Sequence, residues 1–292
     1  MPPARYSVEH ETRYAYASPV AQSWQLARLT PRVLPWQQLL AHSLQIDPPP
    51  DERHDATDSF GNDVTHFALH GAHRRLSVRM RCTVEVGERP ASLPASEPWE
   101  AVRDAVRQLA PSCGLAAARM SEPTPLVPLS AAALAYAAPQ FTPGRDWLHA
   151  VTALMRTIHR DFRFDPHATT VSTAVDEVLQ HRRGVCQDFA HLMLACLRAH
   201  GLPARYVSGY LLTEPPPGQA RLIGVDASHA WVAACSPRCG WVEFDPTNGQ
   251  LADARYLTLA WGADFADVVP LRGVILGGGE QTLKVSVSVT PS

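Results

Sequence analysis

The residue with the clearest capacity for chemistry is Cys186, in the run Arg183-Gly-Val-Cys-Gln-Asp-Phe-Ala. The pattern predicts a helix that follows Gly184 and ends at Gly201-Leu-Pro203, because glycine and then proline commonly follow a helix. Cys186 then lies in the first turn, where unpaired backbone N–H groups and the positive end of the helix dipole favour an anion. Such a position can lower a cysteine pKa and can hold the oxyanion of an acyl-transfer intermediate.

Helical spacing also predicts where the sulfur points. The residues that share its face are apolar, so the thiol should point into the domain; they are Phe189, Ala190, Met193 and Leu197. A buried structural cysteine is the alternative interpretation of Cys186, because cysteine is among the most often buried residue types. Cys196, in the middle of the same helix, is assigned to the core.

Two later segments supply partners for a thiol. Residues 228–235 and 240–245 both have strand character and flank a short turn, which predicts an antiparallel hairpin. With a loop spanning 235–239, Trp231 faces Glu243 and His229 faces Asp245. Facing side chains lie about 4.5–5.5 Å apart at Cβ, within reach of an imidazole–carboxylate hydrogen bond. A slip of one residue would put the two side chains on opposite faces.

The position of Asp245 suits such a pair. It is followed by Pro246, which cannot donate to a strand ladder, so the strand should end there, at the rim of the sheet. A carboxylate at that point can fix the tautomer of His229 and leave the other ring nitrogen to take a thiol proton. A chance cross-strand pair of His229 and Asp245 is the alternative.

The elements that must position these residues follow from periodicity. The spacing predicts an amphipathic helix over 147–158 and a short helix opened by a capping box at Thr173 and ending near His181. Strands are predicted over 204–212 and over the two segments of the hairpin. Helices followed by antiparallel strands indicate an α+β domain over 146–292, which we expect to include the alternating C-terminal strand 283–289.

The rest of the chain differs in texture. Residues 1–90 carry alternating patterns in three runs, the first ended by Pro19, which predict a small β-sandwich-like or barrel domain. Residues 91–145 are rich in proline and form a connecting region, in which only 99–109 and 130–138 have helical character.

Composition limits the possible partners. The 292 residues are 46% hydrophobic and 18% charged, with a formal net charge of −2. A near-neutral balance argues against nucleic-acid or anionic-membrane binding, and no apolar run is long enough to span a bilayer. The six cysteines do not form the pattern of a disulfide framework, and the first ten residues lack the apolar core of a secretory signal. These features predict a cytoplasmic protein, and they leave its oligomeric state open.

Four blocks resemble the core of the bacterial transglutaminase-like superfamily, over about residues 145–250. They are Gly184-Val-Cys-Gln-Asp-Phe-Ala190, Gly201-Leu-Pro-Ala-Arg-Tyr-Val-Ser-Gly-Tyr210, His229-Ala-Trp231 and Gly240-Trp-Val-Glu-Phe-Asp-Pro-Thr-Asn248. The run from Tyr6 to Tyr16, with Leu29-Thr-Pro-Arg32, is similar to the β domain that precedes such cores in bacteria. Bacterial chains with this pair of domains are generally assigned as cysteine proteases.

The resemblance implies a papain-like fold with a catalytic triad of Cys186, His229 and Asp245. It also implies a supporting role for Asp188, which follows the cysteine by two residues and could orient nearby backbone groups; the alternative is a first-turn aspartate that only interacts favourably with the helix dipole. Trp231 and Tyr210 could line an acyl-binding groove, although aromatic strand residues more often serve packing. No residue of the segment 161–166 matches the aromatic oxyanion donor of the animal enzymes, so the second oxyanion donor is unassigned. No acidic loop suggests their calcium site, so we expect no metal or cofactor.

Together these features predict a cysteine-dependent enzyme that acts on the amide bonds of a peptide or protein through a thioester. Water would resolve the thioester in a peptidase or amidase, and we favour this hydrolysis. An amine acceptor would make the protein a protein-glutamine transglutaminase, which uses the same triad. A non-catalytic peptide-binding scaffold is the alternative of another class.

Overall fold

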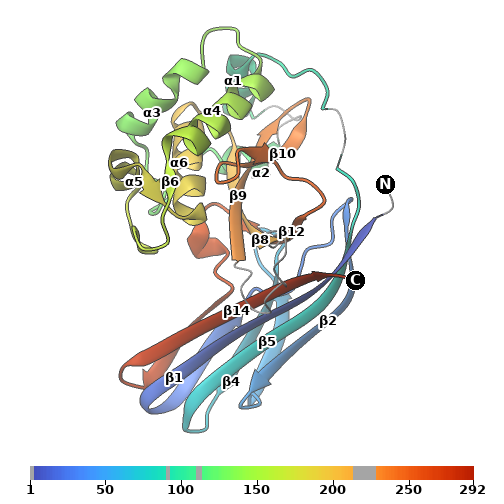
Figure 1. Ribbon diagram of the computed structural model, residues 1–292, viewed down its shortest axis with the longest axis vertical. Helices are drawn as coiled ribbons and strands as arrows, with labels where there is room; N and C mark the ends of the chain where they lie inside the picture. Colours follow the sequence, from blue (N-terminus) through green and yellow to red (C-terminus); the bar gives the residue numbers. More distant parts are fainter. Residues whose placement is uncertain (1–2, 90–92, 110–113, 213–227) are drawn as a thin grey trace, which may run out of the picture.

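The computed structural model describes residues 3–89, 93–109, 114–212 and 228–292. Its long strands gather in one half of the molecule, and the helices with a shorter sheet form the other half (Figure 1). Among the described residues, no helix has both the length and the hydropathy needed to cross a membrane. The mixed architecture confirms the α+β class, with a β-rich N-terminal region before a core of helices and strands.

The first half is built on one seven-stranded sheet of described residues, with the order β2-β5-β1-β4-β3 and two more strands on β1. Its strands are β1 (Ala4–Ala27), β2 (Gln37–Asp47), β3 (Glu52–Thr57), β4 (Asp63–Leu69), β5 (His73–Val86), β13 (Leu271–Gly277) and β14 (Gln281–Pro291). Early in its length β1 lies between β5 and β14, and later it lies between β4 and β13. Buried side chains of both parts join one hydrophobic cluster, as expected for a small sandwich.

Two predictions about this half are wrong. Pro19 does not end the first strand: β1 continues to Ala27, and Pro19 lies where the register with β5 shifts and the partner strands change. The C-terminal strand does not join the sheet of the α+β domain predicted over 146–292, because β14 pairs with β1 from Tyr6↔Pro291 to Tyr16↔Gln281. Alternation identifies a strand, but it does not identify the neighbour of that strand.

The second half contains a five-stranded sheet in the order β11-β10-β9-β8-β12, which helices cover. The connecting helices are α1 (Trp99–Arg107), α2 (Gly114–Arg119), α3 (Ala131–Ala137) and η1 (Ala138–Gln140). The remaining elements are α4 (Trp147–Asp161), β6 (Arg163–Phe164), α5 (Val175–His181), β7 (Arg183–Gly184), α6 (Cys186–Ala199), β8 (Ala204–Leu211), β9 (Ser228–Ser236), β10 (Gly240–Asp245), β11 (Gln250–Leu251), β12 (Tyr256–Gly262) and η2 (Phe265–Asp267).

Helix α6 is the centre of this half. Every residue from Asp188 to Arg198 is buried, because α6 lies on β8 and β9 and is covered by α3, α4 and α5. A helix that is apolar on nearly all sides belongs in a core. The predicted starts of α6 and of α4 agree with the structure, whereas α5 begins one residue later than the capping box predicts. Its N-cap is Ala174, and the Thr173 hydroxyl accepts a hydrogen bond from the Thr170 N–H instead.

Candidate active site

Cys186 is the first residue of α6, at the helix start that the sequence predicts. It is partly exposed and packs against the main hydrophobic cluster of the second half. The N–H groups of a first helical turn have no partners within the helix, so this end of α6 offers donors and a positive dipole to an anion. The geometry therefore suits a sulfur that must carry negative charge during a reaction.

Asp188 stabilises the start of this helix through hydrogen bonds. Its buried Oδ2 accepts hydrogen bonds from the Val185 N–H and from the Thr169 hydroxyl, both at 2.7 Å. Burial raises the pKa of Asp188, while these two hydrogen bonds act in the opposite direction. Gly184 makes room for this carboxylate, because a Cβ there would lie 2.6 Å from Asp188 Oδ2. Asp188 thus orients backbone near Cys186 and does not itself line the cavity around the thiol.

His229 and Asp245 form the pair expected from the hairpin. The His229 Nε2–H donates to Asp245 Oδ2 at 2.7 Å, and Asp245 is completely buried at the last position of β10. This bond leaves Nδ1 as the ring nitrogen available to Cys186. The strand ends before Pro246, as predicted.

The register of the hairpin differs by two residues from the prediction. Strand β9 continues to Ser236, which pairs with Gly240, so the turn is tighter than a loop over 235–239. Glu243 therefore pairs with Ala233, and Asp245 reaches His229 diagonally. A shift of two residues keeps each side chain on its predicted face, which is why the imidazole–carboxylate contact survives.

Asp245 is held by more donors than the sequence suggests. Its Oδ2 also accepts hydrogen bonds from Asn248 Nδ2 at 2.6 Å and from the Tyr256 hydroxyl at 2.7 Å. Its Oδ1 accepts the backbone N–H groups of Thr247 and Asn248, at 2.8 and 3.1 Å. The sequence signal for Asn248 is the turn Asp-Pro-Thr-Asn, in which an aspartate commonly bonds backbone N–H groups just ahead of it. Tyr256 comes from a strand that the sequence pattern did not reveal.

These contacts fix the charges of the pair. Burial lowers the pKa of His229, but hydrogen bonds and charge interactions with Asp245 and Cys186 outweigh it and raise this pKa to about 10. Burial raises the pKa of Asp245, but hydrogen bonds from His229, Asn248 and Tyr256 and the charge of His229 bring it below its usual value. A positive imidazole therefore lies between a carboxylate and the Cys186 sulfur.

Cys186 and His229 line one cavity of about 330 Å³, and both halves of the molecule contribute to it. Strands β1 and β14 supply Thr12, Tyr14, Leu283 and Val285, and the segment after η2 supplies Val269, Pro270 and Leu271. Tyr206 lines it as well. Burial, with a smaller effect of the Cys186 charge, raises the pKa of this phenol well above its ordinary value. Sequence patterns gave no sign that the N-terminal sheet reaches the nucleophile.

The two aromatic residues proposed for an acyl groove lie elsewhere. Trp231 is fully buried behind His229, where its indole N–H donates to Glu243 Oε2 at 2.8 Å. Tyr210 is buried between the two halves, and its hydroxyl bonds His10 Nδ1 at 2.8 Å. Neither is among the described residues that line the cavity. Their positions fit the packing interpretation.

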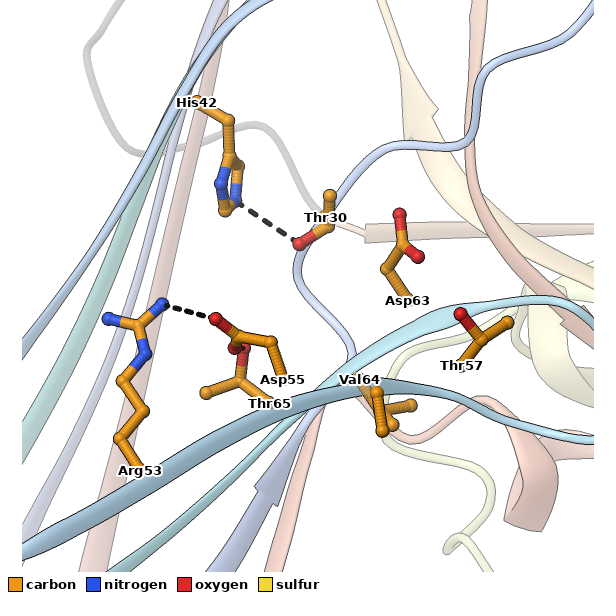
Figure 2. A pocket seen from close by; sticks show the side chains of 9 residues that line it. Thr30, His42, Arg53, Asp55, Thr57, Asp63, Val64 and Thr65 are labelled. Atoms are coloured by element: carbon orange, nitrogen blue, oxygen red, sulfur yellow. Dashed lines mark hydrogen bonds and ion pairs between the residues drawn. The ribbon is translucent and has the colours of Figure 1, made fainter.

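A second cavity, of about 370 Å³, lies in the N-terminal sheet (Figure 2). Its polar groups bond one another: His42 Nε2 lies 3.4 Å from the Thr30 hydroxyl, and the Thr65 hydroxyl donates to Asp55 Oδ1 at 2.5 Å. Arg53 forms an ion pair with Asp55 at 3.6 Å. No cysteine is among its described lining residues, so this cavity offers no thiol nucleophile.

Comparisons with known proteins agree with this fold. Residues 6–85 match the bacterial transglutaminase-like N-terminal region, and residues 135–246 match the transglutaminase-like superfamily. A solved structure of a candidate cysteine protease from Cytophaga hutchinsonii aligns with a TM-score of 0.74 at 19% identity, over 100% of this chain and 91% of that one. This likeness shows a common fold.

Relatives of known sequence extend along the whole chain or part of it. An uncharacterized protein of Mycobacterium tuberculosis is 44% identical over 98% of this chain and 93% of its own length, and one of Mycobacterium leprae is 32% identical over 98% of both. A protein-glutamine gamma-glutamyltransferase of Pseudomonas aeruginosa is 38% identical over 97 residues, which are 32% of this chain and 14% of that protein. This chain therefore belongs to the transglutaminase-like superfamily and carries the bacterial N-terminal region of that superfamily ahead of its core.

Proposed function

We propose that the protein is a cysteine-dependent acyl-transfer enzyme that acts on amide bonds through a thioester. One observation carries the proposal: the His229 imidazole interacts with Asp245 on one side and with Cys186 on the other, and the thiol and the imidazole share a cavity. A base held between a carboxylate and a thiol at a helix start is the arrangement that nucleophilic catalysis by cysteine requires.

The steps follow from this geometry. His229 Nδ1 already holds the thiol proton in the positive imidazole, and the Cys186 sulfur bonds the amide carbon, whose C=O π electrons move to the oxygen and make it an oxyanion near the Cys186 N–H. The carbon–nitrogen bond then breaks, and His229 gives its proton to the leaving amine. Asp245 keeps the imidazole in the required tautomer and stabilises its positive form.

Hydrolysis is the favoured fate of the thioester. A water molecule attacks the acyl carbon, His229 takes one of its protons, and the carbon–sulfur bond breaks to release a carboxylic acid and restore the thiol. The described lining of the cavity holds no aspartate or glutamate, so nothing described there attracts a cationic lysine side chain. Water needs no such group.

Transfer to an amine is the second candidate. The partial similarity of this chain to a protein-glutamine gamma-glutamyltransferase of Pseudomonas aeruginosa favours transfer. The two fates are separated by supplying a glutamine peptide with and without a fluorescent primary amine. Incorporation of the amine faster than release of the free acid would establish transfer and contradict hydrolysis.

Thiol labelling across pH tests the proposal against a scaffold that never turns over. We expect iodoacetamide to label Cys186 well below pH 8, because the thiolate is the reactive form and His229 accepts its proton. The label should be absent from C186A, and labelling should slow at least tenfold in H229A. C239A is the matched control, since Cys239 is also partly exposed but lies outside the cavity. Labelling that rises only near pH 8.5 and spreads over all six thiols would contradict the enzyme.

A further inference from the structure

The catalytic cavity has an apolar wall that comes from the N-terminal sheet. In the pairing of β1 with β14, Thr12 lies opposite Val285 and Tyr14 lies opposite Leu283. These four side chains stand on the sheet face that lines the cavity with Cys186, and we refer to them as the β-wall. The β-wall is therefore a continuous surface supplied by two strands that are distant from the nucleophile in sequence.

The β-wall continues the hydrophobic core of the first half into the cavity. Along β14, alternate residues share a face, so Val287 and Val289 point to the same side as Leu283 and Val285. The first two are 1% and 0% exposed, whereas Leu283 and Val285 are 55% and 49% exposed. The same face thus passes from closed core to open cavity, and two large aliphatic side chains remain uncovered beside the reactive sulfur.

Another part of the cavity lining is also apolar. Phe265, Val269, Pro270 and Leu271 line it, and no lysine, arginine, aspartate or glutamate is among the described lining residues. His10, which also lines it, is uncharged at neutral pH, because burial lowers its pKa to about 4. Among the described lining residues, the formal charges are then those of the proposed catalytic residues.

We infer that the acyl donor is a polypeptide segment whose residues beside the reactive amide are apolar and uncharged, and that the β-wall is the surface that selects it. This inference rests on the proposed function, since it names the substrate of that same site. An apolar side chain of the donor covers Leu283 and Val285 and leaves water, whereas a charged one would lose hydration there and would find no lysine, arginine, aspartate or glutamate among the described lining residues.

The size of the cavity supports a segment rather than a whole domain. A volume of about 330 Å³ lies at the lower end of the range of roughly 300–1,000 Å³ that is typical of ligand pockets. It accommodates only the few groups next to the amide, so selection depends on the residues that flank it. An apolar contact of this kind discriminates by on the order of tenfold or more.

Protection of Cys186 from iodoacetamide measures binding without turnover. Three peptides of equal length would be compared, each with a central glutamine flanked by leucine, by glutamate or by lysine. We expect the leucine peptide to protect Cys186 at concentrations at least about tenfold lower than the two charged peptides. Equal protection by all three, or stronger protection by a charged peptide, would overturn the inference.

Substitutions in the β-wall then locate the selectivity. In L283T/V285T, both positions carry threonine, whose β-branched shape suits a strand and whose hydroxyls make the wall more polar. The matched control is V274T/L276T on β13, where Val274 and Leu276 are 65% and 51% exposed and line no part of this cavity. We expect the preference for the leucine peptide to fall several-fold in L283T/V285T and to persist in the control. An unchanged preference in L283T/V285T would also overturn the inference.

The labelling rate of Cys186 without peptide and the turnover of the peptides distinguish a failure of the β-wall inference from a failure of the proposed enzymatic function. Equal labelling of Cys186 without peptide shows that L283T/V285T retains an intact site. Selective protection with no cleavage or amine transfer would support the inferred role of the β-wall and contradict the proposed enzymatic function. Turnover of all three peptides at equal kcat/KM would support the enzymatic function and contradict selection by the β-wall.

Discussion

At the scale of single residues, Asp245 organises the site from a completely buried position. A carboxylate taken out of water is costly unless hydrogen bonds replace its hydration, and Asp245 receives five of them. Only one of these bonds goes to His229. The other four come from Thr247, Asn248 and Tyr256, which hold the carboxylate in place whether or not the imidazole moves.

The raised pKa of His229 yields a prediction about stability. Because this pKa is about 10 in the folded protein and 6.5 for an ordinary histidine, the folded state binds the proton more tightly. The contribution of His229 to stability is therefore full below pH 6.5 and is lost as the pH rises through about 10. We expect the melting temperature of the wild type to exceed that of H229Q most at pH 6, and the gap to close above pH 10.

An NMR titration of the His229 ring checks the cause. D245N removes the negative charge while keeping the shape of the side chain, so the ring should titrate at a lower pH than in the wild type. Q250A is a control, since Gln250 bonds the Tyr256 hydroxyl and not Asp245 itself. A wild-type midpoint near 6.5, or a midpoint unaltered by D245N, would contradict the assigned interactions.

The alternation of side chains along the hairpin predicted the contact between His229 and Asp245, but it did not predict the residues around this pair. Side-chain alternation along two strands of a hairpin depends only on parity, so His229 and Asp245 could be paired although the turn was tighter than expected. Tyr256 and Leu283 belong to strands whose neighbours are set by long-range packing. No local pattern contains that information.

At the scale of elements, the start of α6 depends on Asp188. In D188A the Val185 N–H loses its acceptor, and we expect the free energy of unfolding to fall by about 0.5–2 kcal/mol, as for loss of a helix cap. D188N keeps an acceptor oxygen and removes a charge that burial disfavours, so its stability at neutral pH should stay close to that of the wild type.

Urea denaturation and Cys186 labelling separate this positioning role from a general loss of stability. We expect iodoacetamide to react more slowly with Cys186 in folded D188A and at nearly the wild-type rate in D188N. Asp176 offers a matched control, because it lies in the first turn of α5 and accepts from the Ser130 hydroxyl, outside the catalytic cavity. D176A should leave the labelling rate unchanged. Equal labelling rates of Cys186 in D188A and the wild type would show that Asp188 does not position Cys186.

Strand β1 shows how far local patterns reach at this scale. Proline lacks an N–H, and alternation before Pro19 correctly gave a strand. The strand nevertheless continues, because the irregular register around Pro19 lets the chain change partners from β14 to β13. A proline that coincides with such a shift interrupts one ladder without ending the strand.

At the scale of the whole molecule, two side-chain amides join the sheets. Strand β12 is an edge strand of the second sheet, and the buried Gln37 bonds both the N–H and the C=O of its residue Thr258, each at 2.8 Å. Asn62 does the same for Trp261, at 3.0 and 2.8 Å. These amides replace the neighbouring strand that the edge of β12 lacks.

Removing both amides tests this junction. Q37A removes the acceptor of the buried Thr258 N–H and N62A removes that of the Trp261 N–H, so we expect Q37A/N62A to lower the free energy of unfolding by about 1–3 kcal/mol for each site. Gln38 is exposed on β2, and Q38A serves as the control. Urea denaturation provides the measurement. A double variant as stable as Q38A would show that the junction is held by apolar packing alone.

Strand β14 also has a consequence for synthesis. The ribosome adds residues 281–291 after Cys186, His229 and Asp245, and domains fold as they emerge. In the proposed enzyme, a nascent chain can therefore bring Cys186, His229 and Asp245 together before Leu283 and Val285 have been added. The proposed selectivity for apolar peptides would then be acquired last, when β14 pairs with β1.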